Sequence, residues 1–367
     1  MGTTQDAPRG LVSMTLTNGT NAADDDDVLV EVMDGIGLLT LNRPRQINAL
    51  TRGMVKILTD QLELWREDPE VGIVVLRGAG TRGFCAGGDI VAFHTAITTG
   101  KQHEFLSFLA EEFRLDGLIA AYPKPVLAYM DGVCMGGGVG LAGHAGIRIV
   151  TPRSSIAMPE ARIGYSPDVG GTHLLGLAPG RLGEHLALTA STMGAGDAIH
   201  AGFADFCISE DSFEEVLSAL PDLVGLPAGE VSIALEILHG TPAPPAPLVA
   251  EAGWIDQAYA ADDVSAILER LDSSPYPGAA TAATALRGNS PLSTQTALRA
   301  VRAARDEAHL PSALARELRV ADYLMKHPDL PEGIRAQIID KDRMPQWSPT
   351  DPAEVDQQEI AAAIAVD

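Results

Sequence analysis

The sequence predicts an α/β fold with a parallel sheet, followed by an extended helical region. Three observations lead to this prediction. Strand-like segments alternate with segments of helical periodicity from Val28 to about Val150, which is the pattern of βαβ units. Two glycine clusters each follow a predicted buried strand. After about residue 210 the periodicity is helical throughout, with proline-rich interruptions.

The first elements are two strands, a helix and a third strand. Residues 28–33 and 36–41 form two β-like runs around a turn at Asp34-Gly35. Apolar residues spaced three or four apart predict a helix over 51–66. The short apolar run 71–76 predicts a buried strand, so the chain begins as a hairpin followed by a βαβ unit.

A second cycle of helix and strand comes next. The spacing predicts a helix over about 103–121, a strand over 126–130 and a helix that begins near Gly137. Farther on, residues 292–326 are long amphipathic helical material, and a short helix is predicted after Asp351.

The pattern divides the chain into three parts. Residues 1–27 are rich in Thr, Asn, Ala and Asp and are expected to form a disordered, acidic tail. Residues 28–225 carry the α/β pattern, and residues 226–367 form the helical C-terminal region. The proline-rich segment 241–247 is predicted to be a loop or linker.

Charge and cysteine content restrict the partners and the compartment. The 49 Asp and Glu against 26 Lys and Arg give a formal charge of -23, which disfavours nucleic acid and membrane surfaces as partners. No apolar run reaches the roughly 18 residues of a membrane span. The three cysteines are too far apart for a CxxC motif, so we expect a reducing, cytoplasmic location. The acidic start also differs from signal and transit peptides.

One glycine motif is misleading. Residues 78–83 fit GxGxxG and directly follow a predicted strand, as in a dinucleotide-binding fingerprint. The next residues, 84–89, continue to bend the chain where the fingerprint needs a helix, and no strand ending in Asp or Glu comes about 20 residues later. A flexible turn is therefore the better interpretation.

Two other glycine clusters, 86–89 and 135–138, indicate a binding site. Each lies just beyond a predicted buried strand, where glycine lets a ligand approach the backbone closely. If both loops face one pocket, their amides supply two N–H donors to one oxygen, which is an oxyanion hole for an enolate or a tetrahedral intermediate. The spacing alone is equally compatible with two tight turns.

Two carboxylates, Glu160 and Asp168, lie eight residues apart in a loop punctuated by glycine and proline. A carboxylate near an apolar pocket has a raised pKa and suits proton transfer or nucleophilic attack. The alternatives are that Glu160 is an acid in the first turn of a helix and that Asp168 is an N-cap before residues 169–177.

The motifs taken together resemble the crotonase (enoyl-CoA hydratase/isomerase) superfamily. Within it, the chain is similar to the 3-hydroxyisobutyryl-CoA hydrolases. The resemblance extends from about Val28 to Pro349, and the segments that carry it are 42–50, 78–90, 131–140, 158–171, 332–342 and 345–347.

The resemblance implies a fold and a set of site residues. It implies a crotonase-like ββα spiral core with the extended helical C-terminal region. Gly88 and Gly137 match the two oxyanion amides, and Glu160 matches the principal catalytic carboxylate. Asp168 matches a second carboxylate of the hydrolases, and Glu112 a further acid that contacts substrate. A solvated helix face is the alternative for Glu112.

The residue at position 140 separates the subfamilies. Enoyl-CoA hydratases carry a second catalytic Glu there, and this chain has Gly140, which cannot transfer a proton. Thioester hydrolysis needs only an oxyanion hole and one carboxylate as nucleophile or base. The resemblance therefore implies hydrolysis of a short β-hydroxyacyl-CoA, most closely 3-hydroxyisobutyryl-CoA in valine catabolism. A hydratase, isomerase or other lyase is the alternative, and a non-catalytic acyl-CoA-binding protein is a third possibility.

The remaining expectations concern ligands and assembly. Arg43 and Arg45 lie in the segment that borders the CoA nucleotide in the family, where a surface charge is the alternative. No cofactor besides the CoA of the substrate and no metal is expected. Related folds form trimers or dimers of trimers, so the resemblance also implies a possible trimer-based homo-oligomer.

Overall fold

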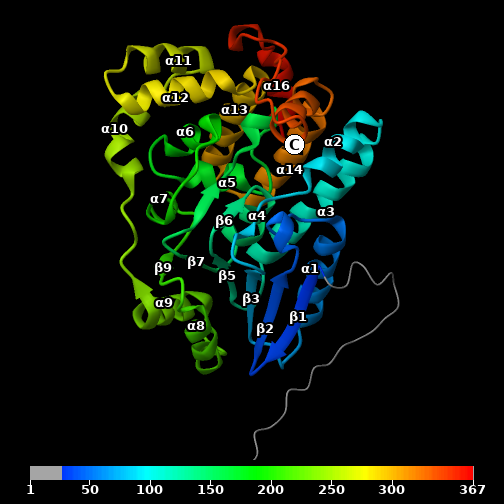
Figure 1. Ribbon diagram of the computed structural model, residues 1–367, viewed down its shortest axis with the longest axis vertical. Helices are drawn as coiled ribbons and strands as arrows, with labels where there is room; N and C mark the ends of the chain where they lie inside the picture. Colours follow the sequence, from blue (N-terminus) through cyan, green and yellow to red (C-terminus); the bar gives the residue numbers. More distant parts are fainter. Residues whose placement is uncertain (1–26, 367) are drawn as a thin grey trace, which may run out of the picture.

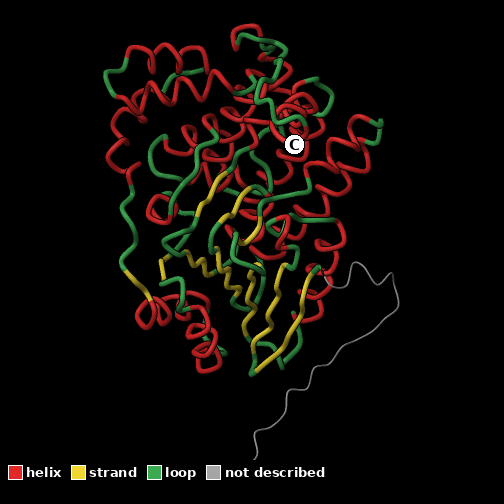
Figure 2. The backbone as a smooth tube through the Cα atoms, viewed as in Figure 1, coloured by secondary structure: helices red, strands yellow, loops and turns green. Residues whose placement is uncertain are grey.

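A computed structural model describes residues 27–366, so all but the last residue of the predicted acidic tail lies outside the described residues. The strands run together through the middle and lower part of the molecule, and the upper part is almost entirely helical (Figures 1 and 2). Among the described residues, no helix is long and apolar enough to cross a membrane.

The main sheet confirms the predicted parallel arrangement. Its order is β1-β2-β3-β5-β7-β9-β10, and the strands from β2 to β9 are mutually parallel. The first strand pairs antiparallel with the second, as the predicted hairpin, and β10 pairs antiparallel with β9. The strands are β1 Val28–Met33, β2 Ile36–Leu41, β3 Ile73–Gly78, β5 Val126–Met130, β7 Ile147–Val150, β9 Phe206–Ile208 and β10 Gly240–Thr241.

A second, parallel sheet of three short strands accompanies the first. It consists of β4 Gly83–Cys85, β6 Val133–Met135 and β8 Ser155–Ala157. Each of these strands comes directly after a strand of the main sheet, so the chain winds through successive pairs of strands with helices between them. This is the ββα spiral. Strands of three residues are too short to show a periodicity, and the sequence pattern therefore does not predict this sheet.

The predicted helices are present with small shifts of their ends. The helical material expected over 292–326 forms two helices, because Ala308 has a φ of 47° and ends the first of them. The proline-rich segment is irregular only over 242–246, since Thr241 ends β10 and Pro247 begins α10. The α-helices are α1 Arg52–Trp65, α2 Ile90–Thr98, α3 Gln102–Ala120, α4 Gly137–Gly143, α5 Gly171–Leu177, α6 Leu182–Thr189, α7 Ala195–His200, α8 Phe213–Ala219, α9 Ala228–His239, α10 Pro247–Tyr259, α11 Val264–Ser273, α12 Pro277–Gly288, α13 Pro291–Glu307, α14 Leu310–Leu324, α15 Asp329–Ile334 and α16 Gln357–Ile364.

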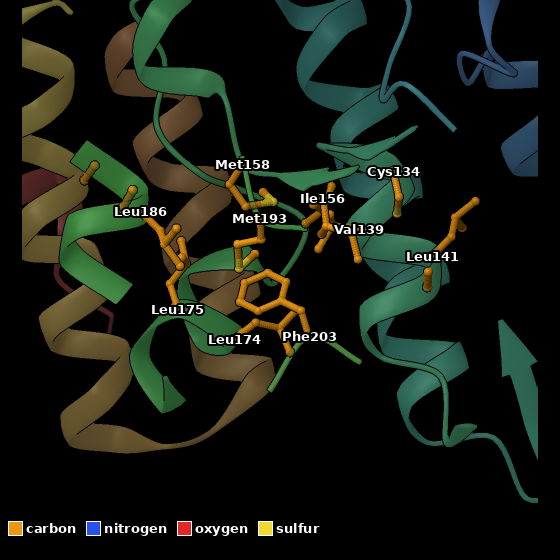
Figure 3. Packing of buried hydrophobic residues seen from close by; sticks show 14 of the residues in the cluster. Cys134, Val139, Leu141, Ile156, Met158, Leu174, Leu175, Leu186, Met193 and Phe203 are labelled. Atoms are coloured by element: carbon orange, nitrogen blue, oxygen red, sulfur yellow. The ribbon is translucent and has the colours of Figure 1, made fainter. Parts of the chain in front are cut away.

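Both faces of the main sheet are covered, as a parallel sheet requires. The side chains of successive strand residues pack into two different buried clusters, one on each face of the sheet. Leu38 belongs to a cluster that packs on α8 and α9, whereas Leu39 belongs to the large cluster shared with α1 and the C-terminal helices. Figure 3 shows part of the large cluster, in which Met158, two residues before Glu160, packs among buried apolar side chains. The loop that carries Glu160 is therefore anchored in the core.

Candidate active site

Three of the predicted site residues converge because they follow the three strands of the small sheet. Gly88 comes after β4, Gly137 after β6 and Glu160 after β8. Since these strands are parallel, their carboxyl ends meet at one edge. A Cβ built on Gly87 would lie 3.5 Å from the Gly137 nitrogen, and one built on Gly136 would lie 3.2 Å from Glu160 Oε1. The loops and the carboxyl group are thus in contact.

A cavity of about 310 Å³ opens at this edge, and it contains both glycines and all three predicted carboxylates. Glu112 reaches it from α3, so this side chain is not on a solvated helix face. The C-terminal region supplies one wall, from α15 and the π-helical turn Arg335–Ile339 that comes after it. The lining residues are Ala86, Gly87, Gly88, Ile90, Phe93, Phe105, Leu109, Glu112, Met135, Gly136, Gly137, Pro159, Glu160, Arg162, Ile163, Tyr165, Asp168, Val169, Leu330, Ile334, Gln337 and Ile338.

The backbone amides of Gly88 and Gly137 have no hydrogen-bond acceptor in the described part of the protein. Gly88 is held from both sides, because the Leu50 amide donates to the Gly87 carbonyl over 2.8 Å and the Asp89 amide donates to the Leu50 carbonyl over 3.1 Å. Gly137 is the first residue of α4, where backbone N–H groups have no partner within the helix. Both amides are therefore available to an oxygen atom of a ligand.

The three carboxyl groups of the cavity are buried, and each has a raised pKa. Burial is the main cause for all of them, because it disfavours the charged form. It raises the pKa of Asp168 to about 7, against the opposing effect of the Tyr165 hydroxyl and the residue's own amide. Burial and the nearby Asp168 charge raise the pKa of Glu112 to about 8. The same two causes raise the pKa of Glu160 well above its ordinary value.

Comparison with known proteins agrees with this arrangement. The model of the enoyl-CoA hydratase/isomerase family matches residues 36–364. The chain belongs to this family. It is 35% identical to the mitochondrial 3-hydroxyisobutyryl-CoA hydrolase of Bos taurus, over 95% of this chain and 91% of that protein. It is 33% identical to the human protein of the same name, over 95% of this chain and 90% of that protein.

Two solved structures of the family have the same fold over nearly the whole chain. A carnitinyl-CoA dehydratase from Mycobacterium thermoresistibile is 41% identical, with a TM-score of 0.86, over 93% of this chain and 97% of its own. An enoyl-CoA hydratase from Rhodobacter sphaeroides 2.4.1 is 41% identical, with a TM-score of 0.85, over 92% of this chain and 97% of its own. The extended C-terminal region is therefore part of this fold and not an appended domain.

Asp116 is a site-adjacent carboxyl that the motifs do not reveal. It lies one helical turn after Glu112 on α3, and both of its oxygens are buried without a hydrogen-bond partner among the described residues. A Cβ built on Gly140 would lie 2.9 Å from its Oδ1 and 2.7 Å from Val169 Cβ. The Asp116 carboxyl group and Val169 thus crowd the position where, by the family resemblance, hydratases carry their second Glu. The sequence feature that could have revealed Asp116 is its place as an acid in the apolar stripe of an amphipathic helix.

Asp116→Asn should stabilise the protein at neutral and alkaline pH. Burial and the neighbouring charges of Glu112, Asp168 and Glu317 raise the pKa of Asp116 well above its ordinary value. The folded state therefore holds a proton that the unfolded state releases, so this group lowers stability as the pH rises from the unfolded pKa toward the folded one. Each unit of such a shift is worth about 1.4 kcal/mol. We expect a gain of at least about 1 kcal/mol in the free energy of unfolding at pH 8, measured by urea denaturation.

The pH dependence of this gain provides the control. At pH 4 the Asp116→Asn variant and the wild type should differ little, because Asp116 is protonated in the folded protein there. Asp222→Asn, at an exposed aspartate, should leave stability unchanged at both pH values. Equal stability of the Asp116→Asn variant and the wild type at pH 8 would contradict the assignment of a buried, destabilising acid.

The two predicted CoA-binding arginines do not line the cavity. The Arg43 guanidinium donates to the Ala49 carbonyl and pairs with Asp27 and Asp89, at 3.6 and 3.7 Å. Arg45 is exposed. Their contact with CoA stays a prediction. A different cation, Arg162, does line the cavity and is exposed. The sequence motifs alone do not single it out.

The cysteine and histidine side chains near the site do not line the cavity. Cys85 and Cys134 are fully buried, and burial raises the pKa of Cys85 to about 12. Burial lowers the pKa values of His144 and His185 to about 4, so both imidazoles are neutral at pH 7. Among the described residues, no group of three or more His, Cys, Asp or Glu side chains has an arrangement that could hold a metal ion.

Proposed function

We propose that this protein hydrolyses the thioester of a short β-hydroxyacyl-CoA, with 3-hydroxyisobutyryl-CoA as substrate and 3-hydroxyisobutyrate and CoA as products. The observation that carries the proposal is one cavity in which the amides of Gly88 and Gly137, which have no acceptor within residues 27–366, lie beside three buried carboxyl groups. The names of the cattle and human relatives support the choice of substrate.

In the proposed mechanism, the amides of Gly88 and Gly137 bind the thioester carbonyl oxygen and stabilise the negative charge that develops on it. Ionised Glu160 attacks the carbonyl carbon, the C–S bond breaks, and the CoA thiolate takes up a proton. Water then cleaves the mixed anhydride and regenerates the Glu160 carboxylate. Activation of water by Glu160 as a general base is the alternative route to the same products.

The other two carboxyl groups suit recognition of the substrate hydroxyl. With a pKa of about 8, Glu112 is mostly protonated at pH 7 and can donate a hydrogen bond. Asp168, with a pKa of about 7, is partly ionised and can accept one. A buried polar group that needs a hydroxyl partner rejects analogues without that hydroxyl far more strongly than an apolar wall does. These residues thus favour a β-hydroxyacyl group over a plain acyl group.

Hydration or dehydration of an acyl-CoA is the second candidate function. The names of the two 41% identical structures favour it, since one is a carnitinyl-CoA dehydratase and the other an enoyl-CoA hydratase. Against it stands Gly140, whose surroundings leave no space for a second catalytic side chain. Asp116 does not take over that role in the cavity, because it is fully buried and does not line it.

Release of free CoA from a panel of acyl-CoA esters, monitored with a thiol reagent, distinguishes the two functions. We expect strong preference for 3-hydroxyisobutyryl-CoA or 3-hydroxypropionyl-CoA, and much slower release from isobutyryl-CoA, which lacks the hydroxyl group. Hydration of crotonyl-CoA is measured in parallel by loss of the enoyl absorbance. Rapid hydration without CoA release would overturn the proposed hydrolase function.

Binding of CoA, location and assembly complete the proposal. Arg43, Arg45 and the cavity-lining Arg162 are the candidate partners of the CoA phosphates. The three free cysteines fit a reducing compartment, either the cytoplasm or the mitochondrial location in the names of the relatives. A trimer-based assembly stays a prediction, which analytical ultracentrifugation tests.

A further inference from the structure

A buried glutamate of the C-terminal region holds the loop that carries Asp168. Glu317 lies on α14 and is 1% exposed. Its Oε2 accepts a hydrogen bond from the Gly170 amide over 2.7 Å. Its Oε1 accepts from the Thr172 amide over 3.0 Å and is also bonded to the Thr172 hydroxyl. The side chain therefore binds a segment about 145 residues earlier in the chain, immediately after Asp168.

The backbone of this segment is strained in a way that needs outside support. Val169 has a φ of 52°, which is unfavourable for a β-branched residue, and Gly170 has a φ of 75°. A left-handed conformation at a non-glycine residue such as Val169 persists only where the surroundings enforce it. The strain lies next to Asp168, which faces the cavity, so the direction of the Asp168 side chain depends on how this turn is held.

His144 holds the same turn from the other side. Its Nε2 lies 2.9 Å from the Val169 carbonyl oxygen, and since a carbonyl only accepts, the proton must be on Nε2. The imidazole stays neutral at pH 7 because burial lowers its pKa to about 4. His144 thus donates a hydrogen bond to the carbonyl of the peptide group whose N–H donates to Glu317. The peptide that joins Val169 to Gly170 is bonded at both ends.

From this geometry we infer that Glu317 is a positioning residue of the active site, which sets the orientation of Asp168 through the turn 169–172. The inference gives the C-terminal helical region a role in the reaction beyond covering the cavity. It rests on the proposed function for the statement that Asp168 acts on the substrate, and it does not depend on which acyl-CoA is the best one.

Glu317→Gln tests the inference with little change in shape. A glutamine has only one oxygen, so its NH₂ group must face either the Gly170 amide or the Thr172 amide, and one of the bonds is lost. We expect kcat on the best acyl-CoA of the wild-type panel to fall about 10- to 100-fold, because small misplacements of a reacting group have effects of this size. The KM should change less than threefold, since the cavity wall is intact. Glu236→Gln, at an exposed glutamate of α9, is the matched control.

Amide hydrogen exchange gives a readout that does not depend on activity. Exchange should become at least tenfold faster at whichever of the Gly170 and Thr172 amides loses its acceptor in Glu317→Gln, while exchange in β3 and β5 stays unchanged. If the wild type releases CoA from no ester, the proposed function fails. The exchange experiment still tests whether Glu317 holds the turn 169–172. A lower melting temperature with unchanged kcat, or unchanged exchange at Gly170 and Thr172, would overturn the inference.

A milder variant covers the case in which Glu317→Gln does not fold. Thr172→Val removes only the hydroxyl bond to Glu317 and leaves both amide bonds in place. It should lower kcat two- to fivefold at unchanged KM. A Thr172→Val enzyme with the kcat of the wild type would contradict the positioning role of Glu317 as strongly as a Glu317→Gln enzyme with unchanged kcat.

Discussion

Replacement of Glu160 by glutamine should reduce CoA release from the preferred ester by a factor of at least about 10² to 10⁴, the range that a general base contributes. The amide keeps the size and polarity of the side chain but can neither attack the thioester nor accept a proton. The fold should be retained, because the neutral amide resembles the protonated acid that burial favours in the free protein. Stopped-flow or steady-state assay with a thiol reagent measures the loss.

The pH profile of the wild type depends on the same residue. Burial and the charge of Asp168 raise the pKa of Glu160, so the reactive carboxylate is present only above this raised value and is lost as the pH falls. The kcat/KM should therefore still be increasing with pH above the range in which an ordinary Glu ionises. Because Glu160 and Asp168 interact, the pKa read from the acid limb of the pH profile belongs to the pair and not to one residue. An acid limb near 4.5, the ordinary value for Glu, would contradict a buried catalytic carboxyl group.

Single turnover in ¹⁸O water tests whether Glu160 forms the mixed anhydride. Label that appears in the Glu160 side chain, measured by mass spectrometry of the proteolytic peptide, indicates the mixed anhydride. Label in the product acid alone is expected both for direct attack by water and for attack on the substrate acyl carbon of the anhydride, so label in Glu160 is the decisive outcome. A Glu160→Gln enzyme that keeps most of its activity would remove this residue from the mechanism altogether, and Glu236→Gln again serves as the control.

The second large effect is expected for Gly137→Ala. A Cβ at this position would lie 2.3 Å from Glu112 Oε1 and 3.1 Å from Leu50 Cδ1. Either the Glu112 carboxyl group is pushed into the substrate cavity, or the loop moves and the Gly137 amide leaves its position. Loss of one oxyanion donor typically lowers kcat by 10²–10³, and we expect a loss of this size. Gly137→Pro should have at least as large an effect, because proline also removes the N–H group.

Two other glycines give graded controls for this prediction. At Gly88 an added Cβ meets the end of the Phe93 ring at 2.7 Å, and a side chain can swing away more easily than a loop can move, so Gly88→Ala should be milder. At Gly229, on α9, nothing lies within 4 Å of the added Cβ, and Gly229→Ala should leave kcat unchanged. A Gly137→Ala enzyme with wild-type kcat would show that this amide does not act on the transition state.

Short-range patterns in the sequence predicted most of the larger elements. The strand at 126–130, the helix at 51–66 and the start of α4 at Gly137 can each be inferred from periodicity and from glycine or proline at the ends. The two glycine loops could be inferred in the same way. The short strands of the second sheet could not, because three residues that pair with a distant segment have no repeating pattern of their own.

The candidate site was predicted unevenly for a related reason. Glu160 and Asp168 stand in a recognisable loop, whereas the family resemblance alone indicated Glu112 and no motif marked Asp116 or Glu317. On a helix, an acid in a mainly apolar stripe has two outcomes, burial or exposure, and neighbouring segments decide between them. For Glu112 that neighbour is the Gly137 loop, which leaves space for its carboxyl group because residue 137 has no side chain.

By itself, the sequence determined the local elements, the positions of the two glycine loops and the order in which the chain reaches them. That both loops line one cavity, and that their amides lack an acceptor among the described residues, came from the tertiary structure. Only the tertiary structure decided the electrostatics of the site. A local pattern is set by the residue types themselves, but a pKa depends on how much water is removed from a group and on which charges approach it. The charge of Asp168 interacts with Glu112 on α3 and with Glu317 on α14. These residues are distant in the sequence, so no local motif predicts the interaction.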